Sequence, residues 1–488
     1  MKYLLTEQNF VPDTVNPTPD YYCTWQTQLY ATSDGKPEKQ RAAIGEQALF
    51  GDQKPYGWAH FYEQARRDLI LVMDDSWDVP FTDYKPYYGS VRLNAEKFPS
   101  FADTDGLKRL TSRICDLGWK GLGGWVCAQE SERFLGDQPP EEYWKDCLTR
   151  MNDAGFAYWK VDWGKHDHSL AFRRMLTDLA EKYAPNLIVE HALIPEIIPY
   201  SDVFRTYDVP AILSIPMTMQ KLQDLADLPA PVGNRMGLID CEDEVYIAAA
   251  GGFAMGVMRH PFVGALPDGR PDMSFPAFHR NLKTKLYEVL RAVRFHRIAP
   301  AFAAHTTAVS PITLTDTWEL KNREAEFESW WFDMESISTC LQDDTITKTA
   351  PAAIARNTDL PAVISNKQGD MPFVVAAHHP NGVFSIATLG RTIGRQYGIP
   401  RCDVTVFTAN ADRIGVFGEY QTLTLQTDRQ VSRVYMQDLA ADRAFDVTDA
   451  VEITKGAVVL PGDLIATIGR SAQPDTDTSE PGVVIVLQ

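Results

Sequence analysis

The chain contains no long apolar run, which is the feature that would mark a membrane-spanning segment. No stretch approaches the roughly 18–20 consecutive apolar residues that such a span needs. The apolar run near the N-terminus, in MKYLLTEQNFVPD, is also too short for the core of a signal peptide. We therefore expect a cytoplasmic protein that has no membrane partner.

Cysteine and positive charge are scarce as well. The seven cysteines are scattered over 488 residues without a CxxC spacing, which argues against both a disulfide framework and a structural zinc site. The formal net charge is −18, and a surface of this sign repels phosphate backbones and anionic membranes. We expect a reduced protein that does not bind nucleic acid. The oligomeric state is open, with a homo-oligomer among the alternatives.

Strands and helices alternate over the first part of the chain. Hydrophobic residues make up 44% and charged residues 23%, an ordinary globular composition, and the length suggests two or three domains. From about residue 20 to 300, short apolar runs alternate with amphipathic segments, which is typical of βαβ units. No GxGxxG turn follows an early strand, which disfavours a doubly wound sheet. We predict a (β/α)8 TIM barrel over residues 1–310.

The pattern changes in the rest of the chain. Residues 311–370 include WELKNREAEFESWWFDMESIS, which suggests a helix, followed by a stretch that resembles a linker. Residues 371–488 contain short alternating runs, such as FVVAAH, GVFSIAT, DVTVFTA and TLTLQT, separated by turn residues. We predict a helical and linker segment over 311–370 and an antiparallel β-sandwich over 371–488.

Polar and aromatic side chains follow the predicted barrel strands. The active site of a (β/α)8 barrel is built from the C-terminal ends of its strands, so these residues should meet at one mouth. Carboxylates, cations and tryptophan rings are the side chains that a sugar-binding site uses. A single acid at a strand end is often only the N-cap of the following helix, which is the alternative interpretation for each residue taken alone. The residues are Trp25, Asp74, Asp75, Trp125, Lys160, Asp162, Glu190, Arg205 and Asp208.

Several of these segments resemble the α-galactosidases of glycoside hydrolase families 27 and 36, and family 27 more closely. YWKVDWG is similar to their nucleophile strand, LILVMDDSW to the paired-Asp strand, and VFRTYD to the acid/base strand. The stretch RLNAEKFPSFADTDGLKRLTSRICDLGWKGLGGW also resembles the family pattern. The resemblance covers roughly residues 20–260, in order, and it implies a TIM barrel with a trailing β-sandwich.

The resemblance implies roles for individual residues. Asp162 would be the nucleophile and Asp208 the general acid/base of a double displacement with retention. Asp202 remains an alternative acid/base, because Arg205 and Asp208 are three residues apart where family 27 commonly has four, and family 36 places its acid in an SD pair. The sugar-binding residues would be Asp74, Asp75, Lys160, Glu190 and Arg205, with Trp25 and Trp125 lining the ring.

The implied activity is hydrolysis of a terminal α-linked sugar from small oligosaccharides or glycosides, without a metal or redox cofactor. The strand VEHAL lacks the sugar-selecting signatures of both families, so N-acetylgalactosamine, glucose and β-L-arabinopyranose remain open, as does transglycosylation. A non-catalytic carbohydrate-binding barrel is a third alternative. A fourth is a metal-dependent hydrolase that uses His166, His168 or His191.

Overall fold

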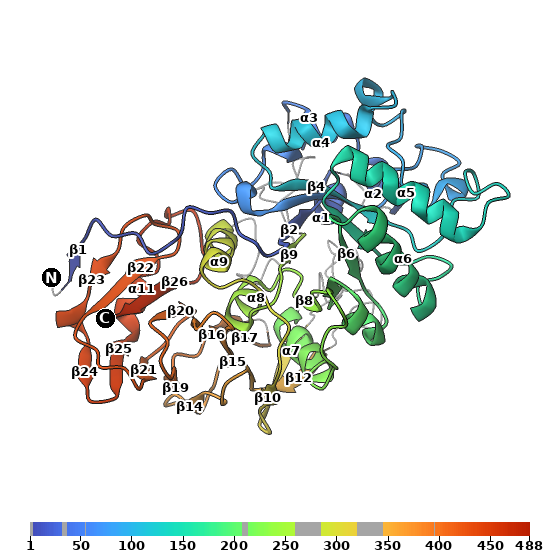
Figure 1. Cartoon of the computed structure of the whole chain (residues 1–488). Helices are drawn as coiled ribbons and strands as arrows, with labels where there is room; N and C mark the ends of the chain where they lie inside the picture. Colours follow the sequence, from blue (N-terminus) through green and yellow to red (C-terminus); the bar gives the residue numbers. More distant parts are fainter. Residues whose placement is uncertain are drawn as a thin grey trace.

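A parallel barrel of eight strands forms the first part of the molecule. The computed structural model describes residues 3–31, 37–53, 55–206, 213–258, 285–319, 345–394 and 396–488. The sheet order is β8-β7-β6-β5-β4-β3-β2-β9, and a parallel bridge between Asp240 and Ala254 joins its two ends. This confirms the predicted TIM barrel (Figure 1). Its strands are β2 (Tyr21–Cys23), β3 (Ile70–Met73), β4 (Gly121–Val126), β5 (Tyr158–Val161), β6 (Ile188–His191), β7 (Val203–Arg205), β8 (Leu238–Asp240) and β9 (Gly256–Val257).

The barrel strands are buried on both faces, which explains their nearly continuous apolar runs. Every residue of β3, β4 and β5 is buried. A glycine is required in β4 because a Cβ on Gly124 would lie 2.8 Å from the indole nitrogen of Trp77. The close packing of this strand brings its last residues, including Trp125, to the mouth of the barrel.

Amphipathic helices surround the barrel. The helix that follows β5 begins where Ser169 accepts a hydrogen bond from the backbone N–H of Phe172, a typical N-cap. The preceding helix ends at Gly155, whose φ of 67° is the left-handed conformation that favours glycine. The helices are α1 (Trp25–Tyr30), α2 (Pro37–Ala42), α3 (Glu46–Phe50), α4 (Gly106–Asp116), α5 (Pro140–Ala154), α6 (Leu170–Tyr183), α7 (Ser214–Asp224), α8 (Val245–Gly251) and α9 (Leu286–Ile298).

Two sheets form the C-terminal domain, and apolar side chains from both share one core. Most strand pairs are antiparallel, and three neighbouring pairs, β13–β15, β16–β20 and β19–β21, are parallel. This confirms the predicted sandwich. The larger sheet has the order β1 (Leu4–Leu5), β23 (Phe445–Asp446), β22 (Val434–Asp438), β26 (Gly482–Leu487), β20 (Arg413–Phe417), β16 (Phe384–Leu389), β15 (Phe373–His378), β13 (Ala353–Arg356) and β10 (Thr307–Val309). The smaller has the order β14 (Ala362–Ile364), β19 (Asp403–Phe407), β21 (Thr422–Gln426), β25 (Ala457–Pro461) and β24 (Glu452–Thr454), and α11 (Gly462–Ile468) follows β25.

The predicted helical and linker segment over 311–370 is corrected by the described part of that range. Residues 313–319 and 345–351 form the antiparallel hairpin β11 (Thr313–Glu319) and β12 (Thr345–Pro351), and β13 and β14 follow it. Of the stretch 318–338, in which a helix was predicted, Trp318 and Glu319 belong to β11, and Trp318 is a buried residue of that strand. Residues 320–344 lie outside the described residues. A second hairpin consists of β17 (Arg391–Ile393) and β18 (Gln396–Gly398).

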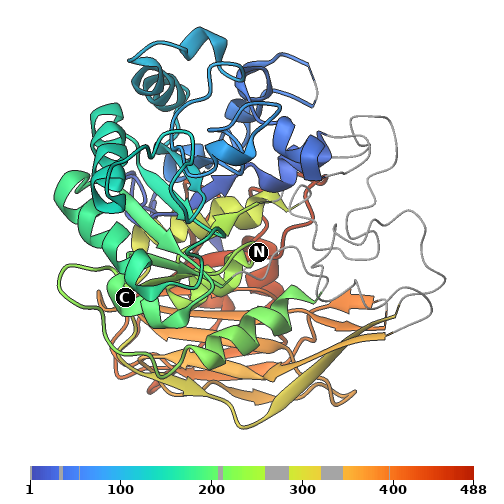
Figure 2. The same ribbon diagram turned by 90° about the vertical axis from the view of Figure 1, so that its right-hand side faces the viewer.

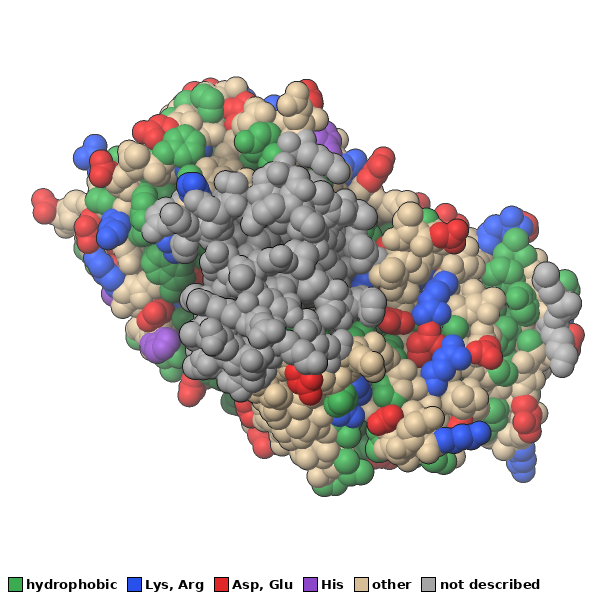
Figure 3. Space-filling model, turned by 180° about the vertical axis from the view of Figure 1, so that it is seen from behind, with side chains coloured by type: hydrophobic (Ala, Val, Ile, Leu, Met, Phe, Trp, Pro, Cys, Tyr) green, Lys and Arg blue, Asp and Glu red, His purple; other side chains and the backbone are tan. Residues whose placement is uncertain are grey.

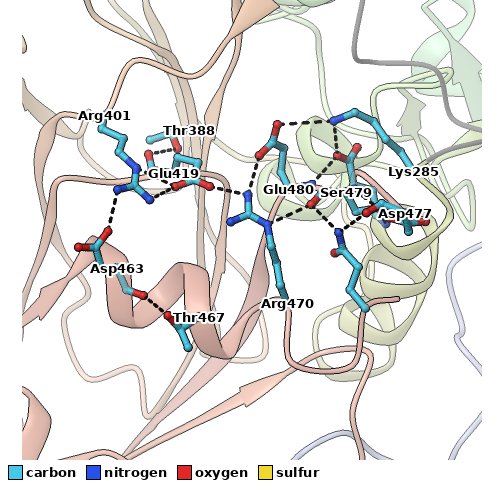
Figure 4. Close-up of polar contacts among 12 residues, drawn as sticks. Lys285, Thr388, Arg401, Glu419, Asp463, Thr467, Arg470, Asp477, Ser479 and Glu480 are labelled. Carbon is cyan, nitrogen blue, oxygen red and sulfur yellow. Dashed lines mark hydrogen bonds and ion pairs between the residues drawn. The ribbon is translucent and has the colours of Figure 1, made fainter. Parts of the chain in front are cut away.

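The nine-stranded sheet packs with one face against α8 and α9 of the barrel, and Figure 2 shows the barrel lying on one side of the two-sheet domain. Ion pairs run across this interface (Figure 4). Lys285, next to α9 of the barrel, contacts Glu480 of the C-terminal domain at 3.5 Å. On either side of this pair, Lys285 contacts Glu288 at 3.0 Å and Arg470 contacts Glu480 at 3.1 Å. The Lys285–Glu480 pair and the buried pair of Arg291 on α9 with Asp438 on β22, at 2.8 Å, join the barrel to the sandwich.

The described surface is mixed in charge. Acidic and basic side chains lie interspersed over the visible part of the C-terminal domain (Figure 3). Among the described residues, no helix combines the length and the apolar character needed to cross a membrane.

Candidate active site

Polar and aromatic side chains from six barrel strands or the loops after them meet at the C-terminal mouth. They surround a cavity of about 120 Å³. The structure therefore brings together seven of the nine residues predicted from the sequence. The cavity is lined by Trp25, Arg41, Asp74, Asp75, Trp125, Lys160, Asp162, Trp163, Arg205, Glu242 and Met258.

Asp162 follows β5 directly, and a separate donor holds each oxygen of its carboxylate. Arg205 donates from its Nη2 to Oδ1 at 3.0 Å, and the Trp125 indole donates to Oδ2 at 3.0 Å. The backbone N–H of Asp162 donates to the carbonyl of Val126 at 3.0 Å. The carboxylate is thus fixed in orientation at the cavity wall and keeps lone pairs for a ligand. Only 1% of the Trp125 side chain is exposed, so its role in the cavity is to donate a hydrogen bond to Asp162.

Asp74 and Lys160 form a buried ion pair. Lys160 Nζ lies 2.9 Å from Asp74 Oδ2 and 3.7 Å from Glu242 Oε1, and the Cys23 thiol donates to Asp74 Oδ2 at 2.8 Å. Burial by itself raises the pKa of Asp74, but Lys160 and the hydrogen bonds from Cys23 and the Asp75 backbone lower it below its ordinary value. Asp74 is therefore an ionised acceptor in the wall of the cavity.

The neighbouring carboxyl, Asp75, has the opposite tendency. Burial raises its pKa to about 6, although Arg41 lowers it. The Arg41 Nε donates to Asp75 Oδ2 at 2.8 Å, and the Ser76 hydroxyl donates to Oδ1 at 2.8 Å. The Arg41 guanidinium also lies 5.8 Å from the ring centre of Trp163. Arg41, which α2 supplies, thus connects two walls of the cavity.

Glu190 does not occupy the predicted position. It was expected to bind the sugar, but its side chain is fully buried and is absent from the described residues that line the cavity. Its Oε2 accepts from Arg205 Nη1 at 3.0 Å, and its Oε1 accepts from the Tyr21 hydroxyl at 3.3 Å. Burial raises the pKa of Glu190, although Arg205 lowers it. Because the Arg205 guanidinium contacts both Glu190 and Asp162, Glu190 orients Arg205.

Of the two proposed acid/base residues, Asp208 and Asp202, the structure describes only Asp202. Asp208 lies outside the described residues, within 207–212. Asp202 precedes β7, whereas the cavity residue Arg205 ends it. The Asp202 carboxylate accepts from the backbone N–H of Val189 at 3.0 Å, at the N-terminal ends of β6 and β7. A strand rises roughly 3.3 Å per residue, so Asp202 belongs to the opposite end of the barrel and is removed as an alternative.

The sequence interpretation missed Arg41, Trp163, Glu242 and Met258. Glu242 follows β8, in the run LIDCEDE, and this acidic strand end carried a usable signal. Its Oε1 lies 3.5 Å from Arg205 Nε and accepts from the Tyr21 hydroxyl at 3.2 Å. Arg41 carried no signal, because a solvated arginine on a short helix has the same sequence pattern.

The histidines of the metal alternative are spread apart. His166 contacts Glu130 at 3.0 Å, His168 is exposed, and His191 is buried against Arg173 and Thr177. Within the part of the chain that the structure describes, no group of three His, Cys, Asp or Glu side chains could hold a metal ion. The histidine pattern of the sequence therefore does not form a common site there.

No protein-family model and no curated protein sequence matches the chain. Solved structures do resemble it. A family 27 β-L-arabinopyranosidase from Geobacillus stearothermophilus has 9% identity and a TM-score of 0.43, over 97% of this chain and 96% of that chain. The α-galactosidase from Saccharomyces cerevisiae has 9% identity and a TM-score of 0.39, over 96% and 98%. α-Galactosidase I from Mortierella vinacea has 13% identity and a TM-score of 0.37, over 70% and 96%.

Proposed function

We propose that the chain is a retaining α-glycosidase that hydrolyses a terminal, non-reducing α-galactoside in small oligosaccharides or glycosides. The observation that carries the proposal is the Asp162 carboxylate, held by Arg205 and Trp125 in a cavity that also contains the Asp74–Lys160 pair. A sugar ring needs both acceptors and donors for its hydroxyl groups, and this cavity supplies both kinds.

The proposed reaction is a double displacement. Asp162 attacks the anomeric carbon as the glycosidic bond breaks, and protonated Asp208 gives its proton to the leaving oxygen. A water molecule then attacks the same carbon and gives a proton to Asp208, which releases Asp162 and the sugar with net retention. Arg205 balances the charge of Asp162 before the attack. Lys160, Asp74 and Asp75 bind ring hydroxyls in this scheme.

A panel of p-nitrophenyl glycosides tests the proposal. It contains the α-galactoside, the α-glucoside, the α-N-acetylgalactosaminide and the β-L-arabinopyranoside, and proton NMR identifies the anomer released first. We expect the α-anomer of galactose from the α-galactoside. If another glycoside is preferred and its configuration is retained, the proposed sugar changes and the proposed mechanism stands. Release of the opposite anomer would contradict the mechanism, and a folded protein without turnover on the panel would favour a carbohydrate-binding barrel.

Asp208→Ala is expected to slow substrates with poor leaving groups far more than activated aryl glycosides, because only the former need a proton on the leaving oxygen. Azide is expected to restore part of the turnover of the activated glycosides and to yield an α-glycosyl azide, because it replaces water in the second displacement and the configuration is retained. Asp202→Ala is the matched control, since its carboxylate faces the other end of the barrel. An azide product from the Asp202 variant, and none from the Asp208 variant, would contradict this assignment.

Sugar affinity is expected to depend on the ionisation of Asp75. The pKa of this carboxyl is about 6, so the affinity that its charged form contributes is present above about pH 6 and is lost as the pH falls through that value. Arg41 lowers this pKa, so Arg41→Met is expected to move the transition to higher pH. Calorimetric titration of the monosaccharide into wild type and variant measures both transitions. Equal profiles for the two proteins would show that the Asp75–Arg41 pair does not bind the sugar.

A further inference from the structure

Arg173 is a buried cation that contacts the backbone of the proposed nucleophile. It lies on α6, which packs against β6 (Figure 1). Its side chain is inaccessible to solvent. Its Nη2 donates to the carbonyl oxygen of Asp162 at 2.8 Å, and its Nη1 donates to the carbonyl of Val161 at 3.3 Å. Its Nε donates to the carbonyl of Asp167 at 2.8 Å. One guanidinium therefore fixes the end of β5 and the loop after it.

The charge of Arg173 is not balanced by a contacting carboxylate. No Asp or Glu among the described residues forms an ion pair with it within 4 Å, and its three oxygen acceptors are backbone carbonyls. Burial lowers the pKa of Arg173 to about 10, and the more distant Asp162 raises it. A buried cation without a contacting carboxylate is costly to a folded protein, and an apolar residue could fill the same space at lower cost.

A closed set of hydrogen bonds fixes the guanidinium. The Thr177 hydroxyl donates to the carbonyl of Arg173 at 3.0 Å, so its oxygen accepts from His191 Nε2 at 2.8 Å. The proton of His191 is then on Nε2, and Nδ1 accepts from Arg173 Nη1 at 3.3 Å. Burial, and then Arg173, lower the pKa of His191 well below its ordinary value, which keeps this ring neutral. The arrangement leaves Arg173 a single orientation.

We propose that Arg173 is a positioning residue for the nucleophile, which holds the peptide of Asp162 and supplies positive charge behind it. The proposal rests on the proposed function. Arg205 contacts the carboxylate of Asp162 from the cavity side, and Arg173 contacts the carbonyl of the same residue from the helix side. The backbone N–H of Asp162 is bonded to Val126 in addition, so the residue is held from three directions. A double displacement needs this precision, because small errors in the attack geometry reduce the rate strongly.

Arg173→Met tests the proposal, with Arg356→Met as the matched control. Arg356 is also buried and donates to three backbone carbonyls, those of Gly251, Gly252 and Phe302, but it lies at the interface with the sandwich. Both variants are expected to lower the unfolding midpoint. Only Arg173→Met is expected to reduce kcat, by about 100-fold at a nearly unchanged KM.

Arg173→Lys keeps the charge but loses the planar fork, so we expect an intermediate kcat at a nearly unchanged KM. A folded Arg173→Met protein with the kcat and KM of the Arg356 variant would overturn the proposal. If Arg173→Met does not fold, a wild-type kcat in Arg173→Lys would overturn it, and a reduced kcat at an unchanged KM would support it. These outcomes require an active wild type. An inactive wild type would instead refute the proposed function.

Discussion

Replacing Asp162 with Asn is expected to reduce glycoside turnover by about four orders of magnitude or more, because the variant lacks the oxygen that forms the glycosyl intermediate. The amide has nearly the same shape as the carboxylate and its oxygen can still accept from Arg205 or Trp125, so the fold should persist. Initial rates on an activated aryl α-galactoside measure the effect, and circular dichroism checks the fold.

Asp178→Asn is the control for the Asp162 variant. Asp178 lies on α6 with a side chain that is 66% exposed, and it pairs with Arg235 on the surface at 3.0 Å. The same chemical change there is expected to leave turnover unchanged, because exposed ion pairs contribute little. A folded Asp162→Asn protein that turns over its substrate as fast as the Asp178 variant would exclude Asp162 as the nucleophile.

Arg205→Met is expected to cause the largest loss of stability among the cavity residues, about 3–5 kcal/mol in the free energy of unfolding. Arg205 is buried and lies 3.0 Å from a carboxylate oxygen of Asp162, 3.0 Å from one of Glu190 and 3.5 Å from one of Glu242. Without the cation these three acids repel one another in a buried space. Turnover should be lost as well, because Arg205 orients Asp162.

The stability deficit of Arg205→Met should depend on pH in a defined direction. Without Arg205 the folded-state pKa of the buried Glu190, already raised by burial, rises further. A carboxyl whose pKa is raised on folding weakens the fold as the pH rises from its unfolded value, so the deficit should be larger at pH 8 than at pH 5. Urea unfolding at both values measures it. Arg291→Met, which separates one buried pair with Asp438, is the comparison, and an equal pH dependence in both would contradict this reasoning.

The barrel could be predicted because its strands are short, apolar and each followed by a distinct polar signal. Asp74, Asp75, Lys160, Asp162 and Arg205 all lie at such ends, and the structure collects them around one cavity. After residue 371, apolar and polar residues alternate with the period of two that is typical of a strand. This pattern predicted strands such as β15 and β19.

Other features depend on distances that no local pattern encodes. Glu190 also lies at the end of a barrel strand, so the same pattern predicted that it binds the sugar. The long side chain of Arg205 contacts it instead, so Glu190 orients Arg205 while Asp162 lines the cavity. Arg41 lies on α2, far from Asp75 in the sequence, and yet its side chain contacts Asp75 in the cavity. Its sequence context is that of a surface residue. Residues 313–319 pair with 345–351, and such a distant pairing depends on tertiary packing, which no local pattern of residues shows.

The most direct test of the central claim is to trap the glycosyl intermediate and locate it. A galactosyl fluoride with additional fluorine on the ring slows the second step, so the covalent adduct accumulates when the first step proceeds through a protein nucleophile. Digestion and mass spectrometry then identify the modified residue. The account predicts one added fluorosugar, on Asp162, and none on the Asp162→Asn protein. An adduct on another carboxylate, or turnover of the fluoride to the inverted sugar without any adduct, would contradict it.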